Sequence, residues 1–425
     1  MKKFLAMLLA LVMALSLVAC GEKKDPAVDD TNTPAEGSKV KVGFITLHDE
    51  NSTYDLNFIN AAKKAIENLG LTEDDYILKT NVPEGQECYE TAMDMVDNGC
   101  NIIFADSFGH EPYMIDAAKE NPEVQFCHST GTRAHTEGLS NYHNAFASIY
   151  EGRYLAGIAA GMKLNEMIEA GKFTAEEAKM GYVGAFTYAE VVSGYTSFYL
   201  GAKSVCPSVT MEVTFTGSWY DETLEKTGAE LLIDRGCKLI SQHADSFGAP
   251  TACQNAGVPN VSYNGSTKNV GADTYIISSR IDWAPYYEYA IKAVMNGTAI
   301  DADWTGTLAT GSVVLEELNT DVAAAGTAEA IEAAKAKLES GELHVFDVST
   351  FTTRADDTMN AFKVDYLKVD ADGHITSYLA DVDTDEAYTG DTEVVHDGYF
   401  AESEKRSAPY FDLQIDGIEL LNTAM

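Results

Sequence analysis

Short apolar runs alternate with amphipathic stretches along most of the chain from residue 39 onward. The apolar run at 40–45 predicts a buried strand, and the apolar spacing over 54–69 predicts a helix that ends at Gly70. The alternation predicts further strands at 76–78, 101–104 and 124–126, and helices at 86–97 and up to residue 119. Strands that alternate with helices are typical of parallel sheets with right-handed crossovers, so a doubly wound lobe is expected here.

A second series of the same kind begins with an apolar run at 180–185. It predicts strands at 210–215, 238–240 and 259–261, and helices up to residue 205, at 221–235 and near 249–256. Because both series have the same order, we expect an α/β protein with two similar doubly wound parallel-sheet lobes.

A repeated sequence supports this pairing of lobes. Asp-Ser-Phe-Gly occurs at 106–109 and again at 245–248, each time after an apolar strand that follows Asp-X-Gly-Cys. Both copies therefore come just past the carboxyl end of a strand, where open α/β sheets bind ligands. Two convergent turns with Asp or Ser as helix caps would give the same pattern. The matching positions favour a cleft that contacts one ligand from both lobes.

The alternation ends near Gly341. The residues at 345–348 predict a strand, and the stretches 362–366 and 376–379 predict a β-hairpin around Asp372 and Gly373.

The first residues have the features of an export signal. Lys2 and Lys3 precede an apolar run at 4–18, which is too short to span a bilayer, where about 20 apolar residues are needed. The run ends in Leu-Val-Ala-Cys-Gly at 17–21, which resembles the lipobox of bacterial lipoproteins. We therefore expect a signal peptide at 1–19, lipidation of Cys20 and a flexible tether at 20–38, with a plain secretory signal as the alternative.

The charge of the chain limits the classes of partner it can bind, and the spacing of its cysteines bears on disulfide formation. The chain has 66 acidic and 29 basic side chains, which argues against nucleic acid or an anionic membrane surface as a partner. The ligand is expected to be neutral or cationic, and membrane contact is expected through the lipid anchor alone. Six cysteines remain beyond Cys20, and their wide spacing favours buried free thiols over disulfides.

The common catalytic and cofactor motifs are missing from the sequence. It contains no GxGxxG, GxxxxGK[ST], GxSxG, HExxH or CxxC pattern, so we expect neither an enzyme nor a cofactor. Cys127, His128, His135 and His143 lack the ligand spacing of a zinc site. The acidic run at 381–385 lacks the glycine and the glutamate of a calcium loop, and no metal is expected.

The segment 151–161 reads Glu-Gly-Arg-Tyr-Leu-Ala-Gly-Ile-Ala-Ala-Gly, whose small residues would let a helix approach its neighbours closely. This segment, the lipobox and the two lobes resemble the basic membrane protein family of lipoproteins, over residues 39 to about 346. The resemblance implies a type I periplasmic-binding-protein-like fold with a hinge between the lobes. It also implies a substrate-binding protein of an ABC importer, anchored on the outer face of the cytoplasmic membrane. Its expected partners are a purine nucleoside or purine base in the cleft and the permease of the transporter.

The resemblance also suggests ligand positions. The family's Ser-Phe-Asn turn after the first strand corresponds to Thr-Tyr-Asp at 53–55, and its Gly-Ser-aromatic turn corresponds to 217–219. A tryptophan there could stack on a base, while carboxylates could accept hydrogen bonds from ligand N–H groups. Where the nucleoside receptors carry a lysine that reaches the sugar, this chain has Arg280, so base against nucleoside stays open. The expected ligand-binding residues are Tyr54, Asp55, Asp106, Ser107, Phe108, Trp219, Asp245, Ser246, Asn264 and Trp283.

We expect the first lobe to comprise 39–148 and about 265–300, and the second lobe 149–264 and about 301–346. Residues 347–425 are expected to form an extension that contains the hairpin. Three other functions stay open: a lipoprotein receptor for another small neutral solute, a receptor for Zn²⁺, and a cell-surface enzyme of unrecognised type.

Overall fold

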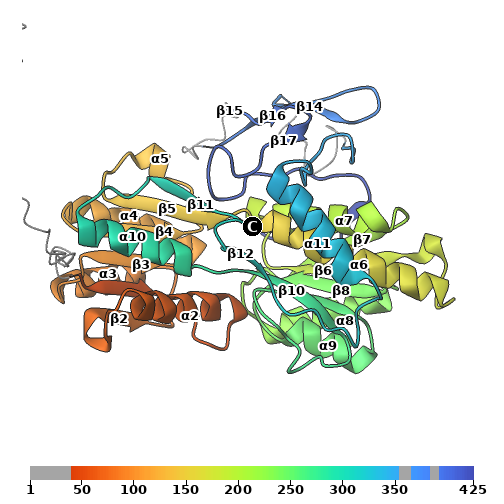
Figure 1. Cartoon of the computed structure of the whole chain (residues 1–425), viewed down its shortest axis with the longest axis horizontal. Helices are drawn as coiled ribbons and strands as arrows, with labels where there is room; N and C mark the ends of the chain where they lie inside the picture. The colour runs from red at the N-terminus through yellow and green to blue at the C-terminus, as the bar shows by residue number, and fades with distance from the viewer. Residues whose placement is uncertain (1–39, 354–364, 383–391) are drawn as a thin grey trace, which may run out of the picture. The chain divides into compact units, whose positions relative to one another are not determined.

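The computed structural model describes residues 40–353, 365–382 and 392–425 (Figure 1). The expected signal peptide, Cys20 and the tether lie outside the described residues, as do parts of the expected hairpin and of the acidic run at 381–385. Within the described ranges, no helix is long and apolar enough to cross a membrane.

The first lobe contains a six-stranded sheet in the order β11-β5-β4-β3-β1-β2, in which every neighbouring pair is parallel. Its strands are β1 (Val42–Ile45), β2 (Tyr76–Lys79), β3 (Ile102–Ala105), β4 (Gln125–Ser129), β5 (Tyr142–Ala147) and β11 (Asp303–Gly306). β1 and β3 are fully buried, as strands in the middle of a parallel sheet must be.

Helices cover both faces of this sheet (Figure 1). On one face, α2 (Thr53–Asn68) and α10 (Ala284–Asn296) share a core with Phe44 and Phe104 of the sheet. On the other face, α3 (Gln86–Asp97) and α4 (Glu111–Glu120) pack on Ile103. The short α5 (Ala134–Glu137) lies between β4 and β5.

The second lobe contains a seven-stranded sheet in the order β12-β10-β9-β8-β6-β7-β18. Its strands are β6 (Lys179–Gly184), β7 (Thr210–Phe215), β8 (Leu239–His243), β9 (Asn260–Tyr263), β10 (Tyr275–Ile281), β12 (Val313–Leu315) and β18 (Ile418–Leu420). β12 is antiparallel to β10, and the other pairs are parallel. α6 (Ile149–Glu169) and α7 (Ala189–Val205) share one core, α8 (Glu222–Asp234) and α9 (Gly248–Ala256) another, and α11 (Thr327–Ser340) packs with the first pair.

α6 and α7 pack backbone against backbone. A Cβ added to Gly157 would overlap the carbonyl oxygen of Phe198, and one added to Gly201 would overlap that of Tyr154. The small residues at 157–161 therefore allow α6 to approach α7 closely, as predicted. A larger side chain at Gly157 or Gly201 would overlap the backbone of the neighbouring helix.

The chain passes between the lobes three times: at Ser148 between β5 and α6, at 282–283 between β10 and α10, and at 307–312 between β11 and β12. This places β10 in the second sheet, although 265–300 was expected in the first lobe. β11 lies in the first sheet, although 301–346 was expected in the second lobe. In both cases the pairing partner decides the sheet: the preceding strand β9 for β10, and the distant strand β5 for β11.

A hairpin is present around Asp372 and Gly373: β13 (Leu367–Val369) pairs antiparallel with β14 (Ile375–Ala380). Its first strand begins at Leu367, just past the expected stretch 362–366, of which the structure describes only 365 and 366, in a turn. β15 (Thr392–Glu393), β16 (Val395–His396) and β17 (Tyr399–Phe400) follow. The strand expected at 345–348 is absent, apart from a single bridge from Asp347 to Tyr399. Asp347 instead accepts a hydrogen bond from the backbone N–H of Ser349, which favours a turn.

Candidate ligand-binding site

A cavity of about 360 Å³ lies between the two lobes, at the carboxyl ends of their parallel strands. The first lobe lines it with Leu47, His48, Tyr54, Asp55, Ser107, Phe108 and Thr130. The second lobe lines it with Glu190, Trp219, His243, Asp245 and Asn264.

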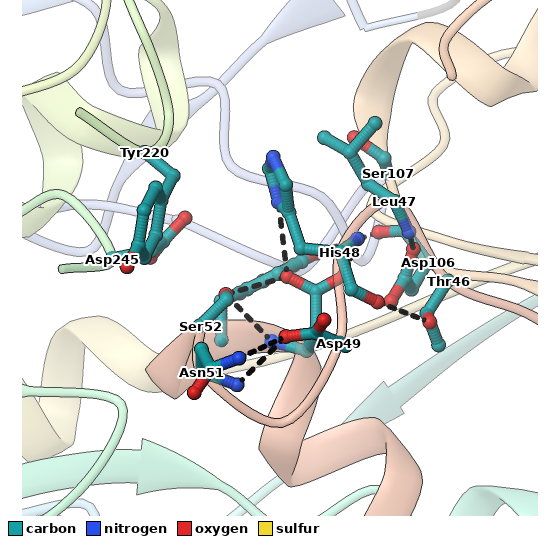
Figure 2. A network of polar contacts seen from close by, with 12 residues as sticks. Thr46, Leu47, His48, Asp49, Asn51, Ser52, Asp106, Ser107, Tyr220 and Asp245 are labelled. Carbon is teal, nitrogen blue, oxygen red and sulfur yellow. Dashed lines mark hydrogen bonds and ion pairs between the residues drawn. The ribbon is translucent and has the colours of Figure 1, made fainter. Parts of the chain in front are cut away.

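Asp55 is held by the turn that connects β1 to α2. Its carboxylate accepts hydrogen bonds from the backbone N–H of His48 (2.7 Å) and from the Ser52 hydroxyl (2.5 Å). Ser52 also caps α2 by accepting from the Asp55 N–H. Burial opposes ionisation, but the hydrogen bonds from His48 and Ser52 outweigh it and lower the pKa of Asp55. Figure 2 shows this turn, with Tyr220 and Asp245 of the second lobe beside it.

Asp106 supports the same turn from beneath. It is buried and is not among the residues that line the cavity. Its Oδ1 accepts a hydrogen bond from the Leu47 N–H (3.1 Å), and its carbonyl oxygen accepts from the Tyr54 hydroxyl (2.6 Å). Burial, followed by the nearby Asp55, raises the pKa of Asp106 well above its usual range. Neighbouring carboxyls with pKa values moved in opposite directions can hold one proton between them.

Trp219 and Asp245 form one wall of the second lobe. The Asp245 N–H donates to the Trp219 carbonyl oxygen (3.0 Å), and the Asn264 amide donates to the Asp245 carboxyl at 3.3 Å. Burial, followed by Asp55 and Glu225, raises the pKa of Asp245 well above its usual range. The Asp245 carbonyl oxygen accepts from the Thr53 N–H of the first lobe at 3.0 Å, so this wall also closes against α2.

Four aromatic rings connect the lobes beside this wall. Phe186 packs edge-on to Trp219, with 5.0 Å between ring centroids, and stacks on Tyr188 at 5.1 Å. Tyr188 stacks in turn on Phe108 of the first lobe at 5.2 Å. Phe108 is 38% exposed, which is unusual for a large apolar side chain and leaves its ring available to a ligand.

Several polar atoms at the cavity have no hydrogen-bond partner among the described residues. They include the Thr130 hydroxyl and Nδ1 of the buried His243, whose Nε2 faces the Glu190 carboxylate at 3.5 Å. Buried polar groups are normally paired, so these atoms suggest that a polar ligand completes them. Thr130 (φ 78°) and Asn264 (φ 63°) also have left-handed backbone conformations, and such strain tends to persist at functional sites.

Two glutamates brace the repeated Asp-Ser-Phe-Gly turns: Glu84, which is exposed, and Glu225, which is buried. Glu84 accepts from the Ser107 hydroxyl (2.6 Å) and from the Gly109 N–H (2.8 Å). Glu225 accepts from the Ser246 N–H at 3.1 Å, and burial raises its pKa to about 7. Ser246 itself accepts from the Gly248 N–H and lies behind the cavity wall. In the first copy Ser107 is the N-cap of the 3₁₀ turn Phe108–His110, so the capping alternative holds for that serine. Neither aspartate is a cap, because the helices that follow begin after His110 and Phe247.

The structure therefore brings together seven of the ten expected residues. Tyr54, Asp55, Ser107, Phe108, Trp219, Asp245 and Asn264 line the cavity, whereas Asp106 and Ser246 lie behind it. Trp283 is a correction: it is 1% exposed and stacks on Phe58 at 4.5 Å in the core of the first lobe. Arg280 is bonded to Glu316, outside the cavity. Five further residues line the cavity and were not predicted from the sequence: Leu47, His48, Thr130, Glu190 and His243. All but Glu190 end or follow a strand.

The residues examined as a zinc site contact different partners. His128 lies 2.6 Å from the Ser107 carbonyl oxygen, His143 bonds to Gln125, and His135 faces Asp303. Within the part of the chain that the structure describes, no three His, Cys, Asp or Glu side chains are grouped so that they could hold a metal. The six described cysteines are buried free thiols, as predicted.

Comparisons with solved structures identify the fold. A solute-binding protein of an ABC transporter from Aeropyrum pernix matches with a TM-score of 0.61 at 19% identity, covering 77% of this chain and 96% of that one. Another from Conexibacter woesei matches with a TM-score of 0.57 at 22% identity, covering 72% and 98%. These neighbours have the type I fold of periplasmic binding proteins, as expected.

Comparisons with known sequences identify the family. A putative ABC transporter glucose-binding protein of Haloferax volcanii is 30% identical over 78% of this chain and 81% of its own length. A purine-binding protein of Brucella abortus is 33% identical over 61% of this chain and 70% of its own length. The family model described as ABC transporter substrate-binding protein, PnrA-like, matches residues 43–347. The family and these relatives are extracytoplasmic solute-binding proteins rather than enzymes. The chain belongs to this PnrA-like family of ABC transporter substrate-binding proteins.

Proposed function

We propose that this substrate-binding protein captures a purine base or purine nucleoside between its two lobes. The ligand is then delivered unchanged to the permease of an ABC importer, and the protein stays tethered by a lipid on Cys20. The chain carries out no chemistry on the ligand in this proposal.

The observation that carries the proposal is the wall formed by Trp219 and Asp245. It places an aromatic plane and a hydrogen-bond acceptor side by side, joined by the 3.0 Å bond between their backbones. Stacking a base on such a ring contributes ~1–3 kcal/mol. A carboxylate suits the N–H groups of a purine, and a charge-assisted hydrogen bond is strong in a closed cleft. The similarity to the purine-binding protein of Brucella abortus supports the same ligand class.

The acidic lining of the cavity argues against phosphorylated forms of these ligands. Asp55, Glu190 and Asp245 all line it, and none of the described lining residues is a lysine or an arginine. A nucleotide would bring negative charge beside these carboxylates without a cation to balance it. An uncharged purine instead brings N–H groups, which can donate hydrogen bonds to these carboxylates.

A sugar is the second candidate, because the relative from Haloferax volcanii that matches over 78% of this chain is a putative glucose-binding protein. Sugars also pack on aromatic rings and bond to carboxylates. The two candidates differ in size and in the number of donors, so direct binding separates them.

The deciding experiment is a thermal-shift and calorimetry panel on the mature chain with adenine, adenosine, guanosine, inosine, AMP, glucose and Zn²⁺. A purine at a hundred times its Kd should stabilise the folded state by ~2.7 kcal/mol. We expect a base or nucleoside to raise the melting temperature and AMP to leave it unchanged. Chromatography should return the bound purine unaltered. A shift with glucose alone, or a cleaved or deaminated product, would contradict the proposal.

A further inference from the structure

The chain returns to the second lobe after the family match ends at residue 347. β18 lies at the edge of the second sheet, parallel to β7, with Ile418 opposite Met211 and Leu420 opposite Val213. The residues that follow β18 run towards the carboxyl end of β7, which is the end of the sheet that holds the ligand cavity.

Hydrogen bonds tie these next residues to the end of β7. The Leu421 N–H donates to the Val213 carbonyl oxygen at 2.8 Å. The Asn422 side chain accepts from the Phe215 N–H (2.8 Å) and from the Thr214 hydroxyl (3.1 Å), and it donates to the Phe215 carbonyl oxygen (2.8 Å). One side chain therefore supplies the pairing that a neighbouring strand would otherwise give to Phe215.

Ala424 reaches the loops beyond β6 and β7. Its carbonyl oxygen accepts from the Thr187 N–H at 2.7 Å, and its own N–H donates to the Thr187 hydroxyl at 2.9 Å. A Cβ on Gly217 would lie 3.8 Å from the Cβ of Ala424, so both loops border this residue. Gly217 has a φ of 74°, which fixes a sharp turn immediately before Trp219.

These two loops carry Trp219, which lines the cavity, and Phe186, which packs on it. Thr187 lies between Phe186 and Tyr188, and Trp219 lies two residues after Gly217. Phe186 and Trp219 are in edge-to-face contact, with their centroids 5.0 Å apart. A segment that holds Thr187 and Phe215 thus holds the backbone next to Phe186 and at the start of the loop that carries Trp219.

We propose that residues 421–424 form a strap that positions the Trp219 loop before the ligand arrives. The affinity of the cavity then depends on a segment outside the family match. A loop that is already ordered loses less conformational entropy when the ligand binds, so the strap increases affinity without touching the ligand. The positioning is independent of ligand identity, while the affinity step rests on the proposed function.

The test uses the full mature chain and the variant Asn422→Ala, which removes three hydrogen bonds. Amide hydrogen exchange reports on positioning without any ligand, through the N–H groups of Thr187 and Phe215. We expect both to exchange at least about tenfold faster in the variant. Adenosine affinity, or that of whichever panel ligand binds, should fall about three- to thirtyfold, while the melting temperature changes by a few degrees at most. Asn422→Asp keeps the acceptor and loses the donor, and should give an intermediate effect.

Thr423→Ala is the matched control, because Thr423 is an exposed neighbour within the strap, and it should change neither measurement. Unchanged exchange at Thr187 and Phe215 in Asn422→Ala would overturn the strap, and so would faster exchange with unchanged affinity. If the unaltered chain binds glucose and no purine, the proposed function fails while the exchange result, together with glucose titration, still decides the strap.

Discussion

Asp245 combines a position at the ligand cavity with a pKa that burial holds well above its usual range. We predict that Asp245→Asn weakens purine binding at least tenfold and leaves the ligand-free melting temperature unchanged or slightly higher. Asparagine keeps one acceptor oxygen but loses the charge, and hydrogen bonds to charged groups contribute ~1.5–3 kcal/mol. Isothermal titration calorimetry with the purine identified in the panel measures the change.

Asp106→Asn is the control for position. Asp106 does not line the cavity, so its substitution should lower stability through the Leu47 turn and change affinity less than Asp245→Asn.

The pH dependence of ligand affinity gives a second check on the role of Asp245. A ligand N–H favours the ionised form of Asp245, so binding should release a proton and tighten as the pH rises, and Asp245→Asn should abolish this release. Equal affinity for Asp245→Asn and the unaltered chain would remove the carboxylate from the binding site.

The sequence located the site well where local pattern determines it. The repeated Asp-Ser-Phe-Gly placed two turns at the carboxyl ends of their strands, and Phe108 and Asp245 do line the cavity. Which side chain of each turn faces the ligand depends on the turn geometry, so Asp106 and Ser246 lie behind the wall. His243 ends a buried strand and has no local pattern that distinguishes it from a core residue. Trp283 was misjudged because an aromatic before Pro285 fits a helix start packed on a core equally well.

At the scale of elements, α6 and α7 pack with their backbones in close contact, and this packing can be tested. Gly201→Ala should destabilise the protein by at least about 2 kcal/mol, because its Cβ would overlap the Tyr154 carbonyl oxygen and force the helices apart. Gly228→Ala on α8 is the matched control. Its Cβ would lie 3.2 Å or more from its neighbours, so the change in stability should stay within about 1 kcal/mol. Urea unfolding of both variants measures the difference, and equal midpoints would contradict the packing argument.

The extension packs through a buried carboxyl whose titration can be followed. Glu402 accepts from the N–H groups of Tyr410 (3.2 Å) and Phe411 (2.9 Å), and burial raises its pKa to about 7. Its folded pKa lies above its unfolded value, so its contribution is fully present below pH 4.5 and is lost as the pH rises through 7.

We therefore predict that Glu402→Gln matches the unaltered chain at pH 5 and is the more stable of the two at pH 8, by roughly 1–3 kcal/mol. Glutamine resembles the protonated carboxyl and has no charge to desolvate. Glu332→Gln, on the exposed face of α11, should show no such dependence. Denaturant unfolding at both pH values is the measurement, and a Glu402→Gln variant that is less stable at pH 8 would contradict the assignment.

Strand and helix positions within 40–126 and 180–261 could be predicted from periodicity, because apolar runs and helical spacing are local. The strands β5, β10, β11 and β12 and the helices α10 and α11 were not predicted. The sheet that each strand joins could not be predicted from local pattern. β10 is an apolar strand that would suit either sheet, and its pairing with β9 decides the matter. β18 was missed for the same reason: a three-residue edge strand has little pattern of its own, and it forms because β7 offers an unpaired edge.

At the scale of the whole molecule, the lobes contact each other directly as well as through the three crossings. The Asn57 amide of α2 donates to the Asn264 carbonyl oxygen at 2.7 Å, and the Thr53 N–H donates to the Asp245 carbonyl oxygen at 3.0 Å. The first contact lies beside a residue that lines the cavity. Ligand between the lobes and contacts across the cleft therefore favour the same closed arrangement, which is how a hinged receptor links binding to a shape that its permease can recognise.

The proposed lipid anchor would determine where that closed form is presented. We propose that Cys20 carries the lipid, so Cys20→Ala should move the protein from the membrane fraction to the soluble fraction of cells. An 18-residue polar leash has a root-mean-square reach of about 20–25 Å, which would hold the lobes close to a permease in the same membrane. Cell fractionation and metabolic labelling with palmitate measure this, with Ser38→Ala in the tether as the control that should stay labelled and membrane-bound. Because the lobes themselves carry the binding site, purified Cys20→Ala should bind its ligand with unchanged affinity. Membrane retention of Cys20→Ala would show that something other than this lipid holds the protein.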